Sequence, residues 1–451
     1  MNFIQKTLDK LKISNCPSDS NFFQAVKEVL ESIEPIIKQN PKYEKYSIVD
    51  QLIVPNKQIQ FKVCWFDDNN KVQVNNGYRI QFNNALGPYK GGLRFHPSVN
   101  SDILKFLAFE QIFKNSLTTL SIGGAKGGSD FNPKGKSDAE IMRFCQAFML
   151  ELHKHIGARI DVPAGDIGVG SREIGYLYGA YKKLTSSYEG VLTGKPDFLG
   201  GSNLRPQATG YGVVYFTKKL LELTGSDTLE GKTCTVSGSG NVAIYTIEKL
   251  SQLGATVVTC SDSRGSIYDK RGLDIELLKK IKFENRDSLE EYAKIYPSVD
   301  YIKVEEYEEN SHFVWSIPSY VAIPCATQNE VTLNDAKNLA SNKTTMYIEG
   351  ANMPSCEDAM EFLQKSDVIF APAKAANAGG VAVSEFEMAQ NASMQKYSSS
   401  KVDGMLKDTM EKICTNMYET ATEYGVEGNY VDGANIAGFK KVADAMIAQG
   451  I

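Results

Sequence analysis

A short glycine-rich turn constrains the fold of this 451-residue chain more than any other feature. A β-type run, GKTCTVS, precedes the turn, a helical pattern follows it, and a second β-type run ends at Asp262. This order is typical of the first βαβ unit of a dinucleotide-binding sheet, in which glycines let the backbone approach a pyrophosphate at a helix N-terminus. A plain βαβ crossover with a tight turn is the alternative. The candidate phosphate-binding residues are Gly238, Ser239, Gly240, Asn241 and Val242.

Three later runs, YVAIP, TMYIEG and DVIFAP, predict further strands of the same Rossmann-like sheet. Each run ends in small or polar residues. Because ligands of an open parallel sheet bind at the carboxyl ends of its strands, we expect Asn329 and Asn352 to meet a cofactor. The alternative is that these side chains only hold their loops by hydrogen bonds.

The stretch before residue 200 carries three lysines and a carboxylate in distinctive settings. Lys90 stands in GPYKGG, Lys126 in GGAKGG and Asp166 in PAGDIG, while Lys114 lies three residues after Gln111 on a predicted helix over 101–117. Converging cations and one carboxylate suit a small molecule with two carboxylates and an amine. A desolvated lysine near other cations has a lowered pKa and can exchange protons near neutrality. For Lys114, a surface ion pair with Glu110 is the alternative.

The remaining pattern predicts an α/β protein of two domains separated by a cleft. Residues 1–50 read as amphipathic helices with Asn21 as an N-cap, and QLIVP, QIQFKVCWF and KVQVNNGYRIQF read as strands. Ser137 and Glu140 predict a capping box. The pattern loosens at 193–202. We therefore expect a substrate-binding and oligomerisation domain over 1–200, a dinucleotide-binding domain over 201–426, and a helix over 427–451 that returns to the first domain.

The composition is that of an ordinary globular protein, with 42% hydrophobic and 23% charged residues and a net charge of −5. It gives no support for binding to nucleic acid or a membrane. The N-terminus lacks the pattern of a signal or transit peptide, so we expect a cytoplasmic protein. The eight cysteines include no C-x-x-C, which favours reduced thiols over disulfides or a zinc site, and we expect no metal.

Several longer motifs resemble those of the hexameric glutamate dehydrogenases, in the Glu/Leu/Phe/Val dehydrogenase family. These motifs are PYKGGLRFHPSVN, GGAKGGSDF, PAGDIGVG, RPQATGYG, PCATQNE, EGANMP, KAANAGGVAVS and GANIAGF, and the resemblance runs from about residue 40 to the C-terminus. It implies reversible oxidative deamination of L-glutamate to 2-oxoglutarate and ammonia with NADP or NAD. It also implies a homo-oligomer, most simply a hexamer.

The resemblance assigns a role to each matching residue. Lys126 looks like the catalytic lysine and Asp166 like the proton-transfer carboxylate. Lys90 with Ser384 resembles the site for the side-chain carboxylate of the substrate. The other implied contacts are Lys114 and Gln111 with the α-carboxylate, the Ala164 carbonyl and Gly165 backbone with the amino group, and Thr193, Thr209 and Asn377 with the nicotinamide end. Two positions depart from the family pattern: Gln207 replaces the usual Glu, and Glu385 the usual Gly.

The residues after the second strand bear on the choice of cofactor. Asp262 alone favours NAD, because an acidic residue there usually binds the ribose 2′-hydroxyl. Ser261, Ser263 and Arg264 instead supply two hydroxyls and a guanidinium suited to a phosphate. Lys134, Lys136 and Arg286 resemble residues that line the 2′-phosphate pocket in NADP-using relatives. We therefore predict NADP, with NAD as the alternative, and an assimilatory role in nitrogen metabolism.

Two other functions remain open from the sequence. A dehydrogenase of apolar amino acids would lack a cation for the substrate side chain, and Lys90 with Ser384 argues against it. A non-catalytic nucleotide-binding scaffold would have lost its lysine or aspartate, and both are present.

Overall fold

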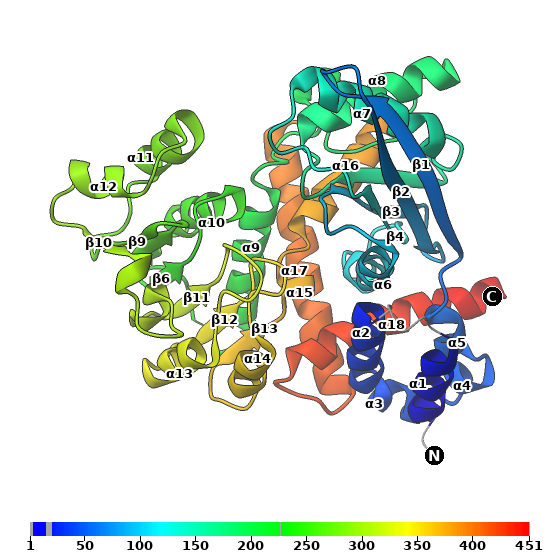
Figure 1. The fold of residues 1–451 in the computed structure, drawn as a ribbon. Coiled ribbons are helices and arrows are strands. Elements are labelled where there is room, and N and C mark those ends of the chain that lie inside the picture. Colours follow the sequence, from blue (N-terminus) through cyan, green and yellow to red (C-terminus); the bar gives the residue numbers. More distant parts are fainter. Residues whose placement is uncertain (1–2, 15–19, 226, 451) are drawn as a thin grey trace. The chain divides into compact units, whose positions relative to one another are not determined.

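The computed structural model describes residues 3–14, 20–225 and 227–450 (Figure 1). The chain divides into two compact units. Unit 1 comprises Met1–Arg205, Val381–Val402 and Asn435–Ile451, and unit 2 comprises Pro206–Gly380 and Asp403–Ala434. Of the four boundaries, the one between Arg205 and Pro206 lies in a loop, and the other three fall inside helices α16 (Gly379–Ser393), α17 (Ser399–Glu423) and α18 (Tyr430–Gln449).

Unit 1 is built on a mixed five-stranded sheet in the order β1-β2-β4-β3-β5. Its strands are β1 (Lys57–Phe66), β2 (Val72–Asn83), β3 (Tyr89–Phe95), β4 (Gly124–Ser129) and β5 (Asp161–Gly165). The first two strands form the long hairpin drawn in blue in Figure 1, and β2 runs antiparallel to β4. Strand β3 lies between β4 and β5 and runs parallel to both, which brings the lysine motifs and the PAGDIG loop to neighbouring strands.

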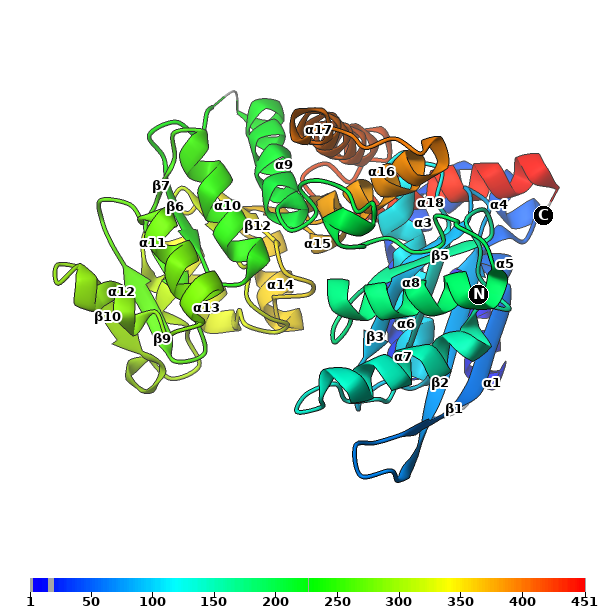
Figure 2. The same ribbon diagram turned by 90° about the horizontal axis from the view of Figure 1, so that it is seen from above.

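Helices cover both faces of this sheet. The helices of unit 1 up to residue 200 are α1 (Phe3–Ser14), α2 (Ser20–Ser32), α3 (Glu34–Gln39), α4 (Lys42–Lys45), α5 (Ile48–Leu52), α6 (Ser101–Leu117), α7 (Asp138–Leu152) and α8 (Ser171–Thr185), with the short turn η1 (Asp197–Leu199), and of these α6, α7 and α8 pack on the sheet. Helices α7 and α8 lie side by side in Figure 2 and share one apolar core with β1 and β3. Helix α6 packs against β2 and β4. The predicted capping box of α7 is confirmed, since Ser137 and Glu140 bond reciprocally.

Unit 2 contains the predicted parallel sheet, in the order β13-β12-β11-β6-β7, and a small antiparallel sheet, β10-β9-β8. The strands are β6 (Thr233–Val236), β7 (Thr256–Val257), β8 (Thr259–Ser261), β9 (Gly265–Tyr268), β10 (Asp300–Lys303), β11 (Val321–Ile323), β12 (Met346–Ile348) and β13 (Ile369–Ala371). The three later runs are therefore confirmed as strands β11, β12 and β13.

The helices of unit 2 flank this sheet (Figure 1). They are α9 (Ala208–Thr224), α10 (Asn241–Gln252), α11 (Ile275–Lys279), α12 (Glu290–Ile295), α13 (Leu333–Ser341), α14 (Glu357–Gln364) and α15 (Ala373–Ala376), with short turns η2 (Lys280–Asn285), η3 (Val304–Glu306) and η4 (Phe313–Ser316). Helix α10 follows the glycine turn as predicted. One core joins Trp315, Tyr347 and Phe370 to α13 and α14.

Three local predictions were wrong. The run QLIVP, at 51–55, begins in helix α5 and ends in a loop. Asn21 lies inside α2 rather than at its cap, and its amide donates to Asp102 Oδ2 at 2.6 Å. Residues 381–402 belong to unit 1, not to the dinucleotide-binding domain, because Glu387 and Gln390 of α16 hydrogen-bond with the loop at 194–201.

Candidate active site

Lys126 and Asp166 form an ion pair in unit 1. Lys126 lies on β4, Asp166 follows β5, and Lys126 Nζ is 3.1 Å from Asp166 Oδ2. Arg94 of β3 donates through Nε to the same oxygen at 2.9 Å. One carboxylate thus meets two cations. The sequence reasoning missed Arg94, although strand periodicity places it on the same face of β3 as Lys90 and Gly92.

The ionisation of this pair follows from burial and from the second cation. Burial lowers the pKa of Lys126, and the attraction of Asp166 only partly opposes that effect, while Arg94 adds to it. For Asp166, burial alone would raise the pKa, but Lys126 and Arg94 together hold it below its usual value. The arrangement therefore gives an ionised carboxylate beside a lysine that loses its proton more readily than in water.

Gly92 makes the position of Asp166 possible. A Cβ at Gly92 would lie 2.8 Å from Asp166 Cβ and 2.9 Å from the Gly165 oxygen. Any side chain on β3 at this point would push the PAGDIG loop away. The last glycine of the GPYKGG motif is therefore a spatial requirement of the site.

Lys90 lies in a second polar cluster of unit 1. It is 2% exposed, and its Nζ donates to the Val162 oxygen at 2.9 Å and to Thr193 Oγ1 at 2.8 Å. Thr193 Oγ1 is in turn 2.5 Å from Ser384 Oγ on α16. The structure thus brings Lys90 and Ser384 together through Thr193. Burial lowers the pKa of Lys90 to about 7, and the nearby Arg79 charge contributes to that shift.

A buried ion pair, Arg79 with Asp161, lies close enough to Lys90 and Lys126 to affect their pKa values. Arg79 of β2 and Asp161 of β5 are fully buried, with Arg79 Nη2 2.5 Å from Asp161 Oδ1. Gln81 donates to the other oxygen of Asp161, and Arg79 Nη1 donates to the Gly91 oxygen. The Arg79 charge lowers the pKa of both Lys90 and Lys126, so both lie within its electrostatic reach. The sequence reasoning missed this pair.

A second buried ion pair fixes the loop that carries Thr193. Lys195 Nζ is 2.7 Å from Glu387 Oε1, and Glu387 Oε2 accepts from the Gly194 N–H at 2.9 Å. Because Glu387 lies one turn after Ser384 on α16, the same helix holds both the loop and the serine. The spacing of three residues was a signal for this role that the sequence reasoning did not use. The neighbouring Glu385 is half-buried; burial raises its pKa, and Lys90 partly offsets that shift.

Helix α6 is tied to the strand that carries Lys90. Asn115 donates to the Lys90 oxygen at 3.1 Å and to the Gly123 oxygen at 2.5 Å. Gln111 donates to Asn115 Oδ1 at 2.6 Å. Gln111 and Lys114 are both half-buried on this helix. Ala164 and Gly165 end β5 beside Gly92 and Leu93 of β3, immediately before Asp166.

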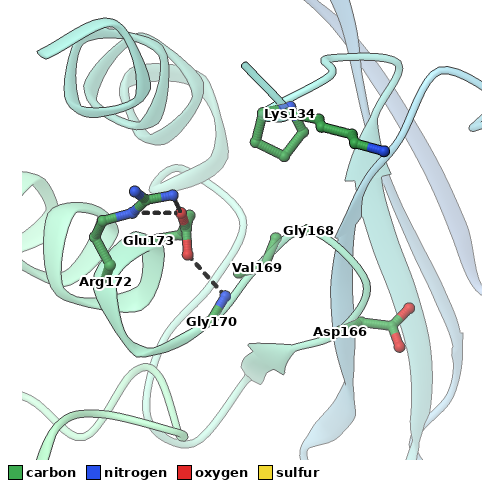
Figure 3. Close-up of a pocket in the computed structure, with 8 residues that line it drawn as sticks. Lys134, Asp166, Gly168, Val169, Gly170, Arg172 and Glu173 are labelled. Atoms are coloured by element: carbon green, nitrogen blue, oxygen red, sulfur yellow. Dashed lines mark hydrogen bonds and ion pairs between the residues drawn. The ribbon is translucent and has the colours of Figure 1, made fainter. Parts of the chain in front are cut away.

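A hollow of about 490 Å³ opens beside Asp166 (Figure 3). Lys134 lies at one side of it, and the first residues of α8 lie at the other. Arg172 donates to Glu173 at 2.8 Å, and Glu173 also accepts from the Gly170 N–H. The hollow is thus lined by Asp166 together with the loop at 168–170 and the first residues of α8.

The glycine turn of unit 2 has the geometry that a pyrophosphate needs. Gly238 has φ +84°, and a Cβ there would lie 2.9 Å from Ala326 Cα. Gly240 has no atom within 4 Å of the position of a Cβ, so the turn is open where Asn241 begins α10. Ser239 and Val242 are half-buried beside it. The residues present therefore fit a dinucleotide, with the helix N-terminus free to face its phosphates.

Asp262 already accepts hydrogen bonds from three groups of its own unit. Its Oδ2 accepts from Lys282 Nζ at 2.8 Å and from the Leu289 N–H at 3.0 Å, and its Oδ1 accepts from the Arg264 N–H at 2.9 Å. Burial raises its pKa, but these bonds outweigh burial and leave the pKa below its usual value. The Asp262 carboxylate therefore stabilises the turn after β8. The contact with Lys282 was not predicted from the sequence. Ser261 is also engaged, since it accepts from the Gly238 N–H at 2.8 Å.

The other candidate phosphate ligands are exposed and belong to two units. Ser263, Arg264 and Arg286 lie on the surface of unit 2. Lys134 and Lys136 lie on the surface of unit 1, where Lys136 is 3.5 Å from Glu140 and lies over the Trp65 ring. The side chains of both groups are therefore exposed to solvent in their own units.

The predicted asparagines meet at the carboxyl edge of the parallel sheet. Asn377 donates through Nδ2 to Asn352 Oδ1 at 2.9 Å and to the Gly350 and Ala351 oxygens. Its Oδ1 is buried and has no hydrogen-bond partner within the described residues. Asn329 is exposed and left-handed, with φ +55°, and its N–H donates to the Met353 oxygen. Thr209 is half-buried in the first turn of α9, after the N-cap Gln207.

The described residues contain no group of three or more His, Cys, Asp or Glu side chains that could hold a metal ion. All seven cysteines in that part of the chain are free thiols; Cys16 lies outside the described residues. No helix traced in the structure combines the length and apolar character that a membrane span requires.

Comparisons with known proteins match this arrangement. The family model described as "Glutamate/Leucine/Phenylalanine/Valine dehydrogenase" matches residues 200–450, and "Glu/Leu/Phe/Val dehydrogenase, dimerisation domain" matches residues 55–183. The chain is 56% identical to the NADP-specific glutamate dehydrogenase of Helicobacter pylori, over 100% of both chains. It is 53% identical to the NAD(P)-specific glutamate dehydrogenase of Xylanibacter ruminicola, over 99% of both. A crystal structure of Plasmodium falciparum glutamate dehydrogenase has a TM-score of 0.94 at 49% identity, and the match covers 99% of this chain and 94% of that one.

Proposed function

The chain belongs to the Glu/Leu/Phe/Val dehydrogenase family, and on that premise we propose that it is an NADP-dependent glutamate dehydrogenase (EC 1.4.1.4). L-Glutamate, water and NADP⁺ become 2-oxoglutarate, ammonium, NADPH and a proton, and the reaction runs in both directions. The observation that carries the proposal is the buried Lys126–Asp166 pair in the same unit as a separate buried cation, Lys90. A diacid with an amine needs both features.

Lys126 and Asp166 would move the protons of this reaction. Asp166, which is ionised before the substrate binds, would accept a proton from the substrate ammonium and become neutral. It would return that proton to the same nitrogen when ammonia leaves. Lys126, whose pKa is lowered, would take the proton from the water that attacks the imine carbon. Arg94, which lowers the pKa of Asp166, would favour the return of Asp166 to its ionised form after the transfer. These steps need no group beyond the side chains of unit 1.

The substrate carboxylates would be held by cations from two elements. Lys90 with Ser384 would bind the side-chain carboxylate, and Lys114 with Gln111 would bind the α-carboxylate. The Ala164 oxygen and the Gly165 backbone would face the amino group. The support is that Lys90 is buried, so a neutral side chain beside it would leave a charge unpaired in the apolar interior.

NADP, when bound, accepts the hydride from the substrate Cα. The glycine turn at 238–242 would hold its pyrophosphate, and Asn377 and Thr209 of unit 2 with Thr193 of unit 1 would hold the nicotinamide end. The pairing of Asp262 with Lys282 removes the usual partner of a 2′-hydroxyl and leaves Ser263 and Arg264 for a 2′-phosphate.

We further propose a cytoplasmic homohexamer. The match to a dimerisation domain supports an oligomer. So does β1, an edge strand whose hairpin exposes Phe66, Val72 and Val74. An exposed apolar edge of this kind is typical of a surface that another chain covers.

Steady-state kinetics of the purified full-length protein tests the proposal. We expect rapid oxidation of NADPH with 2-oxoglutarate and ammonium, and at least about a hundredfold lower kcat/KM with 4-methyl-2-oxopentanoate, which has no second carboxylate. A preference for the apolar keto acid would identify the enzyme as a dehydrogenase of apolar amino acids. Binding of NADPH without turnover of either substrate would favour a non-catalytic scaffold.

A further inference from the structure

A buried carboxylate, Glu349, connects two loops at the carboxyl edge of the parallel sheet. It follows β12 and is 6% exposed. Its Oε1 accepts from Ser355 Oγ at 2.8 Å, and its Oε2 accepts from the Ala373 N–H at 2.9 Å. Ser355 ends the loop after β12, whereas Ala373 opens α15 after the neighbouring strand β13. One side chain therefore fixes the ends of two adjacent strands to each other.

The two segments that Glu349 joins also carry Asn377 and its hydrogen-bond partners. Asn377 follows α15 directly, and its Nδ2 donates to oxygens of Gly350, Ala351 and Asn352 in the loop after β12. These three acceptors fix which end of the amide is nitrogen. Its Oδ1 is then left buried without a hydrogen-bond partner in the part of the chain that the structure describes. A buried carbonyl oxygen of this kind is costly unless a ligand N–H meets it.

We propose that Glu349 is the positioning residue for the nicotinamide half of the cofactor site. Its carboxylate holds the loop at 350–355 against α15, so that the Asn377 oxygen stays where the carboxamide N–H of the cofactor can reach it. The inference rests on the proposed function, because it takes the ligand to be NADP.

The hydrogen bonds around Glu349 run in one direction. When Glu349 is ionised, its carboxylate only accepts, so Ser355 donates a hydrogen bond to Glu349, and Tyr347 then donates to Ser355 Oγ, 2.7 Å away. Replacing Glu349 with glutamine keeps the shape of the side chain. It also places an NH₂ group against one of the two donors. Facing the Ala373 N–H, that group loses the bond; facing Ser355, it reverses the hydroxyl bond and leaves the Tyr347 proton without Ser355 as its acceptor.

Glu330 provides a matched control in the same unit. Like Glu349, it lies at the carboxyl edge of the parallel sheet, after β11. Burial raises the pKa of Glu330 and of Glu349 to about 7. Glu330 Oε1 accepts from the N–H groups of Ala326, at 2.9 Å, and Thr327, at 3.2 Å. Ala326 is the residue that packs against Gly238. Glu330 therefore supports the phosphate turn, whereas Glu349 supports the nicotinamide end.

Calorimetric binding to the full-length protein without substrate separates these roles. The two probes are NADPH and 2′-phospho-ADP-ribose, which keeps the phosphates but lacks the nicotinamide. In Glu349→Gln we expect the Kd of NADPH to rise about tenfold while that of 2′-phospho-ADP-ribose changes less than about twofold. In Glu330→Gln we expect both Kd values to rise by the same factor. Ser355→Ala keeps the carboxylate but removes one of its donors. In this variant we expect the Kd of NADPH to rise less than in Glu349→Gln, again with little change in the Kd of 2′-phospho-ADP-ribose.

Equal weakening of both probes in Glu349→Gln and Ser355→Ala would overturn the inference, because Glu349 would then be a general structural group. Unchanged binding of both probes in these variants would also overturn it. If Glu349→Gln does not fold, Ser355→Ala alone decides between these results. Failure of the wild type to bind either probe would instead count against the proposed function.

Discussion

At the residue scale, the ionisation of Lys126 and Asp166 decides how protons move in the proposed reaction. Replacing Lys126 with alanine or Asp166 with asparagine removes one partner of the 3.1 Å pair. We expect kcat to fall about 10²- to 10⁴-fold in each variant, the usual contribution of a positioned acid or base. Steady-state kinetics with glutamate and NADP⁺ measures the effect.

The matched control for these variants is Asp68→Asn, which removes an exposed carboxylate paired with Arg143 in the same unit. We expect that variant to keep the wild-type kcat. Circular dichroism and thermal melting establish that all three variants are folded. Near-normal turnover in folded Lys126→Ala would remove the proposed role of this lysine.

Lys90 gives a prediction about pH, because its pKa is about 7 in the protein without substrate. Above pH 7 the amine is mostly neutral, but a bound carboxylate requires the ammonium form. Binding of 2-oxoglutarate must therefore take up a proton, and its affinity should fall about tenfold for each pH unit above 7. Calorimetry at pH 8 in two buffers of different ionisation enthalpy measures the uptake, which we expect to be nearly one proton.

The Lys90→Leu variant separates this proton from any taken up by Lys126. We expect it to bind 2-oxoglutarate weakly and to lose the proton uptake, with improved relative activity toward norleucine. If the wild type binds 2-oxoglutarate at pH 8 with no net proton uptake, then Lys90 is already charged and the pH argument fails.

Single residues were the easiest part of the site to find from sequence, because glycines framed them. Lys90, Lys126 and Asp166 were all singled out, and the structure places each near a partner of opposite charge or a hydroxyl. Arg79 and Asp161 were not, since nothing local marks two ordinary strand residues 82 positions apart as a fully buried pair. Such a pair depends on strand order, which is set by packing across the whole sheet.

At the scale of elements, β3 is shaped by the need to admit Asp166. We expect Gly92→Ala to lower stability by about 1–3 kcal/mol through crowding, and to lower kcat by displacing the carboxylate. Gly179→Ala is the control, since a Cβ there meets no atom within 4 Å and α8 should gain about 0.5–1 kcal/mol. Denaturant titration and kinetics measure the two effects. Equal stability changes in both variants would contradict the crowding argument.

The turn after β8 carries a prediction about cofactor choice. Asp262 is neutralised by Lys282, so Arg264 on the exposed turn is left to face a phosphate. We expect the wild type to prefer NADPH to NADH in kcat/KM. Arg264→Ala should reduce the ratio of kcat/KM for NADPH to kcat/KM for NADH about tenfold, because the value for NADPH falls and the value for NADH does not. Lys270→Ala, which removes an exposed cation of the same unit, should leave the ratio unchanged. A wild type that prefers NADH would contradict the phosphate argument.

Helices with strong caps and strands before glycine turns were predicted well. The capping box of α7 and the β6–turn–α10 unit illustrate this, because their signals are local. The run QLIVP was misread since a short apolar run has no periodicity that separates strand from helix. The side-chain contacts of Asp262 were also beyond the sequence, because Lys282 reaches it from η2, twenty residues away.

At the scale of the whole molecule, the exposed face of the β1–β2 hairpin gives a test of assembly. We expect the wild type to have about six times the chain mass of 49.7 kDa by light scattering. Val74→Lys places a charge on an edge where the side chain is 62% exposed and should reduce that mass. Ile295→Lys, at a similarly exposed site in unit 2, is the control and should not. A wild-type mass of one chain would contradict the proposed hexamer.

The return of the C-terminal segment to unit 1 has a consequence for biosynthesis. Asn435 donates to Ser32, Gly438 packs on Ser116 of α6, and Tyr43 and Lys42 both donate to Asp444. Unit 1 thus joins residues that are about 400 positions apart in the chain. On a ribosome adding roughly 5–20 residues per second, α2 and α6 wait tens of seconds for their partner helix. During that interval Tyr43 lacks the Phe439 ring that covers it in the folded protein, and chaperones that bind exposed apolar side chains have time to act.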